Sequence, residues 1–498
     1  MSTVDDKVEG LTVTEKILSR LSKKTFLNLW SYSNPYFKKG KELCDLIVIC
    51  DNNIILFSDK EVAFSINDNL DISWNRWYKT AIKKSVNQLK GAERRLFLNS
   101  SNIYLDSSCT KLLPIKILDF NEIKIHLVVV ANGIELACKK YFDGGAGSLI
   151  FNSDKKLGEA LFTIGDENPS GTFVHILDSF TLPLLLQELD TIFDFVQYLE
   201  EKEKFIRNNK LIIYTGEEEL LGFYFRNFNA NENKHTFFNK DHDSMDGIFI
   251  NEGHWQGLSK HPQYLAKKEA DKISYFWDEL INRFSNQILQ GTSIRHGESR
   301  EVHEGGVRYM ALEPRIYRRI LSKGLLDSIN SYCFERSPIK ISTCLSLSHP
   351  NTTYIFIQFP FDSQYSSYHD DQEKRRHYLY ACCMAAKVKF ANLVRIVGII
   401  MEPPLINSKI TSESILLLDC SSKFWSEEMQ LKGELYQKKL HVFQSENMKN
   451  YKIKEKNFPD IYKTPSFLLK KRRKINKRFG IKRILFLTKP KSKASDLM

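Results

Sequence analysis

The chain has 498 residues, of which 42% are hydrophobic and 27% are charged, so it is too long for one core and too apolar for a wholly disordered protein. The formal net charge is +12, and the 13 basic residues between positions 461 and 498 face only one acidic residue there. The rest of the chain is therefore balanced, and the excess positive charge forms a tail that attracts phosphate backbones or anionic membrane.

The spacing of the cysteines and the length of the apolar segments indicate in which cellular compartment the protein resides. Nine cysteines are scattered without a C-x-x-C spacing, which favours free thiols over a disulfide framework or a thiolate zinc site. The first residues, MSTVDDKVEG, show no apolar secretory signal, and no run of about 18 apolar residues indicates a membrane span. We therefore expect a cytoplasmic protein.

The first expected domain covers residues 1–151 and starts with a helix. Thr12 and Glu15 have the spacing of a capping box, and Asn34-Pro35 ends the segment. The apolar runs LCDLIVIC and IILFSDK then predict two strands joined tightly at DNN, before a helix over about 74–98. The glycine-rich run DGGAGS lacks the GK[ST] of a phosphate loop and is typical of a flexible turn.

Four further segments follow on pattern. We expect a mainly helical region over 152–290 with an irregular loop at 229–262, and a linker or mobile loop over 291–306. Alternating strand and helix patterns over 307–450 predict a second α/β domain, and 451–498 form the basic tail. The predicted fold class is thus multidomain α/β, with mixed α and β regions.

The length of the hairpin turn decides which polar side chains meet. A two-residue turn places Asp45 on one face with Ser58 and Lys60, whereas a three-residue turn pairs Asp45 with Asp59. The shorter turn keeps the apolar positions of the two strands in a consistent pairing, so we favour it. Carboxylates on such a face suit Mg²⁺ or Mn²⁺, and a neighbouring lysine offsets the charge of a phosphate and positions water.

The run from Glu15 through ELCDLIVICDNNIILFSDK resembles the PD-(D/E)XK nuclease superfamily, nearest to its Mrr-like and nuclease-related-domain branches. That superfamily has a helix with a Glu before the hairpin, then an Asp, then (D/E)-x-K. The resemblance covers residues 12–98 and implies a restriction-endonuclease-like core. It makes Asp45 the metal-binding acid and Lys60 the catalytic lysine, with Glu15 and Gln88 as further catalytic residues.

One position departs from the motif, because Ser58 stands where the acid of (D/E)-x-K is expected. Ser58 is then a weak metal ligand beside Asp45, and Glu42 or Asp59 would have to compensate. Each residue also has a structural interpretation: SDK as a solvated strand end, Glu15 as the capping acid, and Gln88 as an exposed helix residue.

We therefore expect a metal-dependent nuclease that acts on nucleic acid, with DNA favoured over RNA, and by analogy a role in defence against foreign DNA. The alternative is a catalytically inactive nucleic-acid-binding or scaffold protein. In a third interpretation the second α/β domain is a sensor for a small ligand or a protein partner; the sequence leaves the oligomeric state open. Nonspecific affinity is assigned to the tail residues Lys470, Lys471, Arg472, Arg473, Lys474, Lys477, Arg478, Lys482 and Arg483.

Overall fold

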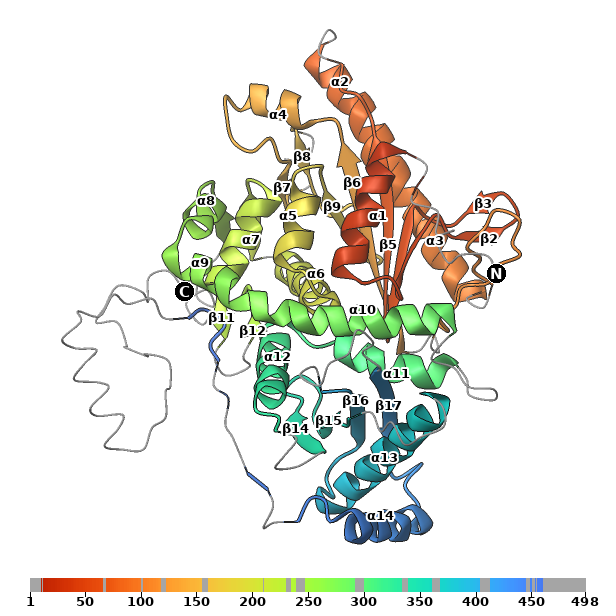
Figure 1. Cartoon of the computed structure of the whole chain (residues 1–498). Helices are drawn as coiled ribbons and strands as arrows, with labels where there is room; N and C mark the ends of the chain where they lie inside the picture. The colour runs from red at the N-terminus through yellow and green to blue at the C-terminus, as the bar shows by residue number, and fades with distance from the viewer. Residues whose placement is uncertain are drawn as a thin grey trace, which may run out of the picture. The chain divides into compact units, whose positions relative to one another are not determined.

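The computed structural model describes residues 10, 12–65, 69–99, 102–117, 122–154, 160–208, 210–229, 234–238, 247–291, 300–333, 339–360, 368–403, 413–444, 448–449, 453 and 455–459. It shows a multidomain α/β fold with several mixed sheets (Figure 1). The chain divides into two compact units, unit 1 (Met1–Lys268 with Phe458–Met498) and unit 2 (Glu269–Asn457). Within the described residues, no helix combines the length and the apolar character that crossing a membrane requires.

The helices of unit 1 are α1 (Val13–Thr25), α2 (Leu70–Trp77), α3 (Lys84–Asn99), α4 (Glu135–Tyr141), α5 (Thr181–Glu188), α6 (Ile192–Arg207), α7 (Glu217–Arg226), α8 (His254–Ser259) and α9 (Pro262–Asp271), the last of which runs past the unit boundary. Its strands are β1 (Ser31–Ser33), β2 (Tyr36–Lys38), β3 (Lys41–Glu42), β4 (Leu46–Cys50), β5 (Asn53–Glu61), β6 (Lys124–Asn132), β7 (Ile150–Asn152), β8 (Thr163–Ile164), β9 (Val174–Leu177), β10 (Leu211–Tyr214), β11 (Phe228–Asn229), β12 (Lys234–His235) and β13 (Ile248–Ile250).

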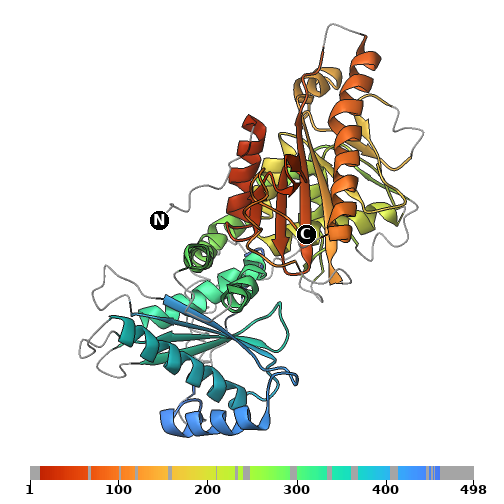
Figure 2. The same cartoon turned by 90° about the vertical axis from the view of Figure 1, so that its right-hand side faces the viewer.

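The main sheet of unit 1 has the order β1-β4-β5-β6-β9. The pairs β1–β4 and β4–β5 are antiparallel, whereas β5–β6 and β6–β9 are parallel. Helices cover both faces of the central strand β5: Phe57 meets Phe26 at the end of α1, and the next residue, Ser58, meets Gln88 of α3 (Figures 1 and 2). Consecutive strand residues point to opposite faces, which explains why β5 is buried almost throughout.

The predicted hairpin is confirmed with its two-residue turn. Cys50 pairs with Asn53, and Leu46 pairs with Phe57. Asp51 in the turn has φ +56°, a left-handed conformation that Asp tolerates better than most residues. Continuing the same register places Asp45 opposite Ser58. The face shared by Asp45, Ser58 and Lys60, which the two-residue turn predicts, is therefore correct.

A second sheet of unit 1 has the order β13-β10-β7-β8. Its strands β10 and β13 are parallel, and each leads from its carboxyl end into a helix, α7 and α8 respectively. In this open α/β arrangement the loops after the two strands, at residues 215–216 and 251–253, lie at one edge of the sheet.

Unit 2 is the second α/β unit that the sequence predicts. Its strands, in the order β14-β15-β16-β17, are β14 (Lys340–Leu345), β15 (Thr352–Gln358), β16 (Arg395–Met401) and β17 (Glu413–Asp419). Its helices are α10 (Tyr275–Gln290), α11 (Arg300–Ala311), α12 (Arg315–Asn330), α13 (Tyr368–Lys389) and α14 (Glu427–Leu440).

Two glycines show how helices cover both faces of this sheet. A Cβ on Gly398 of β16 would lie 2.6 Å from Cys383 Sγ of α13, and a Cβ on Gly305 of α11 would lie 2.8 Å from Leu417 Cδ2 of β17. Both distances are shorter than a carbon side chain permits, so glycine allows each helix to approach its strand closely. All nine cysteines of the chain are free thiols, as predicted.

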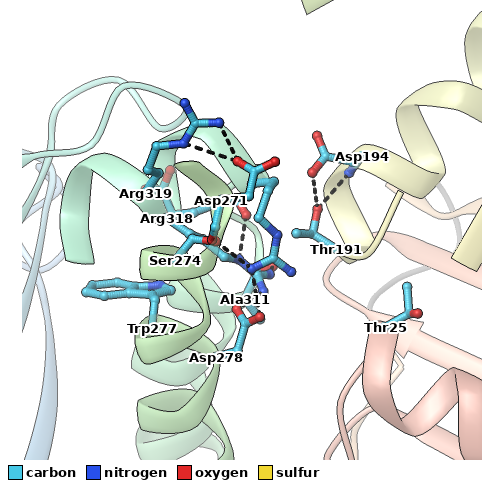
Figure 3. A network of polar contacts seen from close by, with 12 residues as sticks. Thr25, Thr191, Asp194, Asp271, Ser274, Trp277, Asp278, Ala311, Arg318 and Arg319 are labelled. Carbon is cyan, nitrogen blue, oxygen red and sulfur yellow. Dashed lines mark hydrogen bonds and ion pairs between the residues drawn. The ribbon is translucent and has the colours of Figure 1, made fainter. Parts of the chain in front are cut away.

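Buried arginines of α12 tie the helices of unit 2 together. Arg319 forms an ion pair with Asp271, and Arg318 pairs with Asp278 Oδ1 at 2.6 Å (Figure 3). Arg318 also donates to the main-chain oxygens of Glu313 and Ala311. Each guanidinium is fully buried, so these bonds supply the pairing that burial of a charge requires.

The domain boundaries differ from those expected. A boundary at 151 would separate β6 from its parallel neighbour β9, and the contacts place the division between residues 268 and 269 instead. The described part of the region 152–290 is mainly helical, as expected, but it also contributes β9 to the main sheet and β7, β8, β10 and β13 to the second one. The expected irregular loop at 229–262 contains β13 and α8, and the described end of the expected linker, 300–306, is helical.

Candidate functional site

The sequence-predicted site residues of unit 1 gather around the start of the β4–β5 hairpin. Glu15 lies in the first turn of α1, where it completes the predicted capping box with Thr12. Glu42 ends β3, and Asp45 directly precedes β4. Lys60 lies near the end of β5, two residues after Ser58 and on the same face.

Asp45 is the centre of this cluster. Its side chain is 4% exposed, and Oδ2 accepts a hydrogen bond of 2.5 Å from the main-chain N–H of Asp59. The Nζ of Lys60 lies 4.0 Å from the same oxygen, at the limit of an ion pair, while the lysine side chain remains 38% exposed. The lysine therefore compensates the buried acid without being confined to it, and it can reach an incoming anion.

Asn34 joins the two glutamates to this cluster. Its Nδ2 donates to Glu15 Oε2 at 3.3 Å and also to Glu42 Oε1. Its own carbonyl, Oδ1, is buried and has no hydrogen-bond partner among the described residues. A buried amide oxygen without a partner is costly, and a cation or a water would satisfy it.

Burial sets the ionisation of the acids in the cluster. It raises the pKa of Asp45 despite the charge of Lys60 and the Asp59 N–H, and it raises the pKa of Glu42 despite the Asn34 amide. Burial raises the pKa of Asp59 to about 6, against hydrogen bonds from Thr14 and Asn132. The acids also raise one another's pKa values, so the cluster is deficient in positive charge.

Ser58 and Asp59 point to opposite faces of β5. The Ser58 hydroxyl is fully buried and donates to Gln88 Oε1 at 3.3 Å, so the predicted glutamine does lie beside the motif. Asp59 turns toward the other face, where its Oδ1 accepts a hydrogen bond of 2.6 Å from Asn132 Nδ2. Asp59 is thus held by the end of β6 and approaches Asp45 through its main chain.

Two residues of the cluster escaped the sequence analysis. Asn34 was interpreted only as part of a helix-ending Asn-Pro pair, and Asn132 was not singled out. The one available signal for Asn132 is its position before Gly133 at a strand terminus, which is also typical of an ordinary turn.

The donor chemistry fits a hard divalent cation. Asp45 offers a buried carboxylate, and Glu42 and the Asn34 carbonyl add oxygen atoms, the ligand type that Mg²⁺ prefers. In the described part of the chain, however, no three His, Cys, Asp or Glu side chains are already grouped to hold a metal ion.

The predicted nucleic-acid-binding residues of the tail, from Lys470 to Arg483, lie outside the described residues. In comparisons with known proteins, no protein-family model, curated protein or solved structure matches the chain.

Proposed function

We propose that unit 1 is a metal-dependent nuclease of the PD-(D/E)XK type that hydrolyses phosphodiester bonds in nucleic acid. The observation that carries the proposal is the hairpin register, which brings the buried Asp45 opposite Ser58 and next to the accessible amine of Lys60. The positions of Glu15 on the preceding helix and of Gln88 on the following one agree with the order of residues in that superfamily.

The residues have distinct roles in this proposal. Asp45, with oxygen atoms of Glu42 and Asn34, would hold Mg²⁺ or Mn²⁺, and the bound ion would polarise the scissile phosphate. Lys60 faces the entering phosphate, orients the attacking water and offsets negative charge as the bond to the leaving oxygen breaks. Water adds across the P–O bond, leaving a phosphate monoester and a hydroxyl.

A second candidate function rests on the serine at position 58. Ser58 forms a hydrogen bond with Gln88 where the motif has an acid, so the structure has one carboxylate fewer on this face than the motif requires. A domain that binds nucleic acid without cleaving it is the function that this substitution favours. Defence against foreign DNA is the biological role that we propose for the active form, by analogy of fold alone.

The experiment is cleavage of plasmid DNA and of single-stranded RNA in the presence of Mg²⁺ or Mn²⁺. We expect Asp45→Asn and Lys60→Ala each to lower the rate on the order of 100-fold or more, because each removes a group that acts on the charged transition state. Asp71→Asn and Lys79→Ala, exposed residues of the α2–α3 segment, are the matched controls and should cleave like the wild type.

Circular dichroism must show that all four variants are folded. Cleavage that survives in both Asp45→Asn and Lys60→Ala would contradict the nuclease proposal. If no variant and no wild-type protein cleaves, but the wild type binds DNA, the nucleic-acid-binding alternative replaces it.

A further inference from the structure

A second concave site lies in unit 1, away from the hairpin. It is a cavity of about 400 Å³ beside the second sheet, where β10 and β13 end. Ligands of open α/β sheets bind at this edge, outside the carboxyl ends of parallel strands. Its lining residues are Cys138, Phe142, Gly144, Gly145, Ala146, Gly147, Ser148, Ile150, Thr215, Asn251 and Glu252.

The glycine-rich loop DGGAGS forms one wall of this cavity. Gly147 has φ +87°, and a Cβ there would lie 2.6 Å from the main-chain oxygen of Glu135 in α4. The loop is therefore packed against α4 in a conformation that requires glycine, rather than being only the flexible turn that the sequence indicates. A wall of glycines also exposes main-chain atoms to anything that enters the cavity.

A buried polar pair lies behind one wall of the cavity. Ser148, which lines the cavity, is 5% exposed, and its hydroxyl is buried beside Glu218 at the start of α7. Burial raises the pKa of Glu218 to about 8, and the Ser148 hydroxyl opposes that rise. The Ser148 hydroxyl is therefore engaged with Glu218, and the exposed side chains of Asn251 and Glu252 are the polar groups that a ligand would meet.

The charge of the lining restricts the chemistry of that ligand. None of the described lining residues is basic, and Glu252 adds a carboxylate, so a phosphate would be repelled and left unpaired. The acceptors are the Glu252 carboxylate, the Asn251 amide and the Thr215 hydroxyl, and the apolar walls are formed by Phe142 and Ile150. A suitable ligand has hydroxyl or amino donors at one end and a flat apolar ring at the other.

We propose that this cavity binds a nucleoside without a phosphate group. The ring of a base would lie against Phe142 and Ile150, and the ribose diol would donate to Glu252, which can accept two hydrogen bonds. The volume lies within the range of pockets that enclose small ligands. This inference does not depend on the nuclease proposal, since none of the hairpin residues lines the cavity.

Isothermal titration calorimetry of the full chain tests the proposal with adenosine, guanosine, cytidine and uridine, and with the matching 5′-monophosphates. We expect at least one nucleoside to bind with a Kd on the order of 1 mM or tighter, and its monophosphate to bind about tenfold more weakly. Glu252→Gln and Phe142→Ala should each weaken binding about tenfold. Both residues are partly or fully exposed, so the variants should fold, and Glu122→Gln is the matched control because Glu122 is an exposed acid elsewhere in unit 1.

Three results would overturn the proposal. One is the absence of heat from all four nucleosides up to millimolar concentration. The second is a monophosphate that binds more tightly than its nucleoside, which would contradict the charge argument. The third is equal affinity in the wild type, Glu252→Gln and Phe142→Ala, which would place the ligand elsewhere.

Discussion

Among the buried carboxylates of unit 1 that have a lysine partner, Glu217 and Asp45 form ion pairs that differ in kind. Nζ of Lys202 in α6 lies 2.5 Å from Oε2 of Glu217 in α7, and both side chains are less than 5% exposed. Tyr198 and Tyr214 donate to the two carboxylate oxygens of Glu217 at 2.8 and 3.0 Å. Both charges of this pair have partners. The pair therefore joins two helices and leaves no free oxygen of Glu217 to bind a ligand.

The Asp45–Lys60 pair is incomplete by comparison. Nζ of Lys60 lies 4.0 Å from Oδ2 of Asp45, and the lysine side chain is 38% exposed. Asn34 beside it has a carbonyl oxygen without a partner among the described residues, and burial raises the pKa of Asp45, Glu42 and Asp59. The contrast teaches that a buried lysine–acid pair alone does not identify a site. Unsatisfied oxygen atoms and an accessible cation do.

The largest effect expected from this comparison is on stability. Lys202→Met should lower the free energy of unfolding by about 3–5 kcal/mol, because it leaves Glu217 buried without its counter-ion. Lys60→Met should cost less than about 1 kcal/mol, because the lysine is partly exposed and Asp45 keeps the Asp59 N–H. Chemical denaturation measures both. Equal losses of unfolding free energy in Lys202→Met and Lys60→Met would contradict the difference between the two ion pairs.

An intermediate effect is expected from the titration of Asp59. Burial raises the folded pKa of Asp59 to about 6, above its ordinary value of 3.8, so its contribution to stability is fully present below about pH 4 and is lost as the pH rises through 6. Asp59→Asn, which keeps an oxygen for Asn132, should therefore be more stable than the wild type at pH 7.5, by about 1–3 kcal/mol. The difference should vanish at pH 4. Calorimetry at pH 7.5 and at pH 4 measures the stability of both proteins. A stability difference between Asp59→Asn and the wild type that is the same at both pH values would contradict the raised pKa of Asp59.

A smaller effect should follow from restoring the motif acid. Ser58→Asp buries one more carboxylate opposite Asp45, so without metal the variant should melt below the wild type. Saturating Mn²⁺ should raise its Tm more than that of the wild type, corresponding to roughly 1–2 kcal/mol of added linkage. Ser58→Asn, which adds similar volume without charge, is the control. A metal-induced shift no larger in Ser58→Asp than in Ser58→Asn would show that position 58 does not face the ion.

The hairpin was predictable because its information is local. The register follows from a two-residue turn between apolar strands, and it alone sets Asp45 against Ser58 and Lys60. The partners that complete the cluster come from far along the chain, as Asn132 does, 73 residues after Asp59. No pattern near Asp59 indicates which distant amide will bind it.

The second sheet was missed for a different reason. Its strands β7, β8, β10 and β13 have only two to four residues, too few for alternation to show, while the strong periodicity of α6 dominates the same region. The cavity beside this sheet is built from several separate segments, so its lining emerges only when the fold brings them together.

The measurement that tests the central claim most directly is a Mn²⁺ titration followed by electron paramagnetic resonance, comparing the wild type, Asp45→Asn and the control Asp71→Asn at pH 7.5. If the hairpin is a metal-dependent site, the wild type and Asp71→Asn bind one Mn²⁺ with the same affinity, and Asp45→Asn loses at least about tenfold in affinity. Equal Mn²⁺ binding by all three proteins, or none by the wild type, would contradict it.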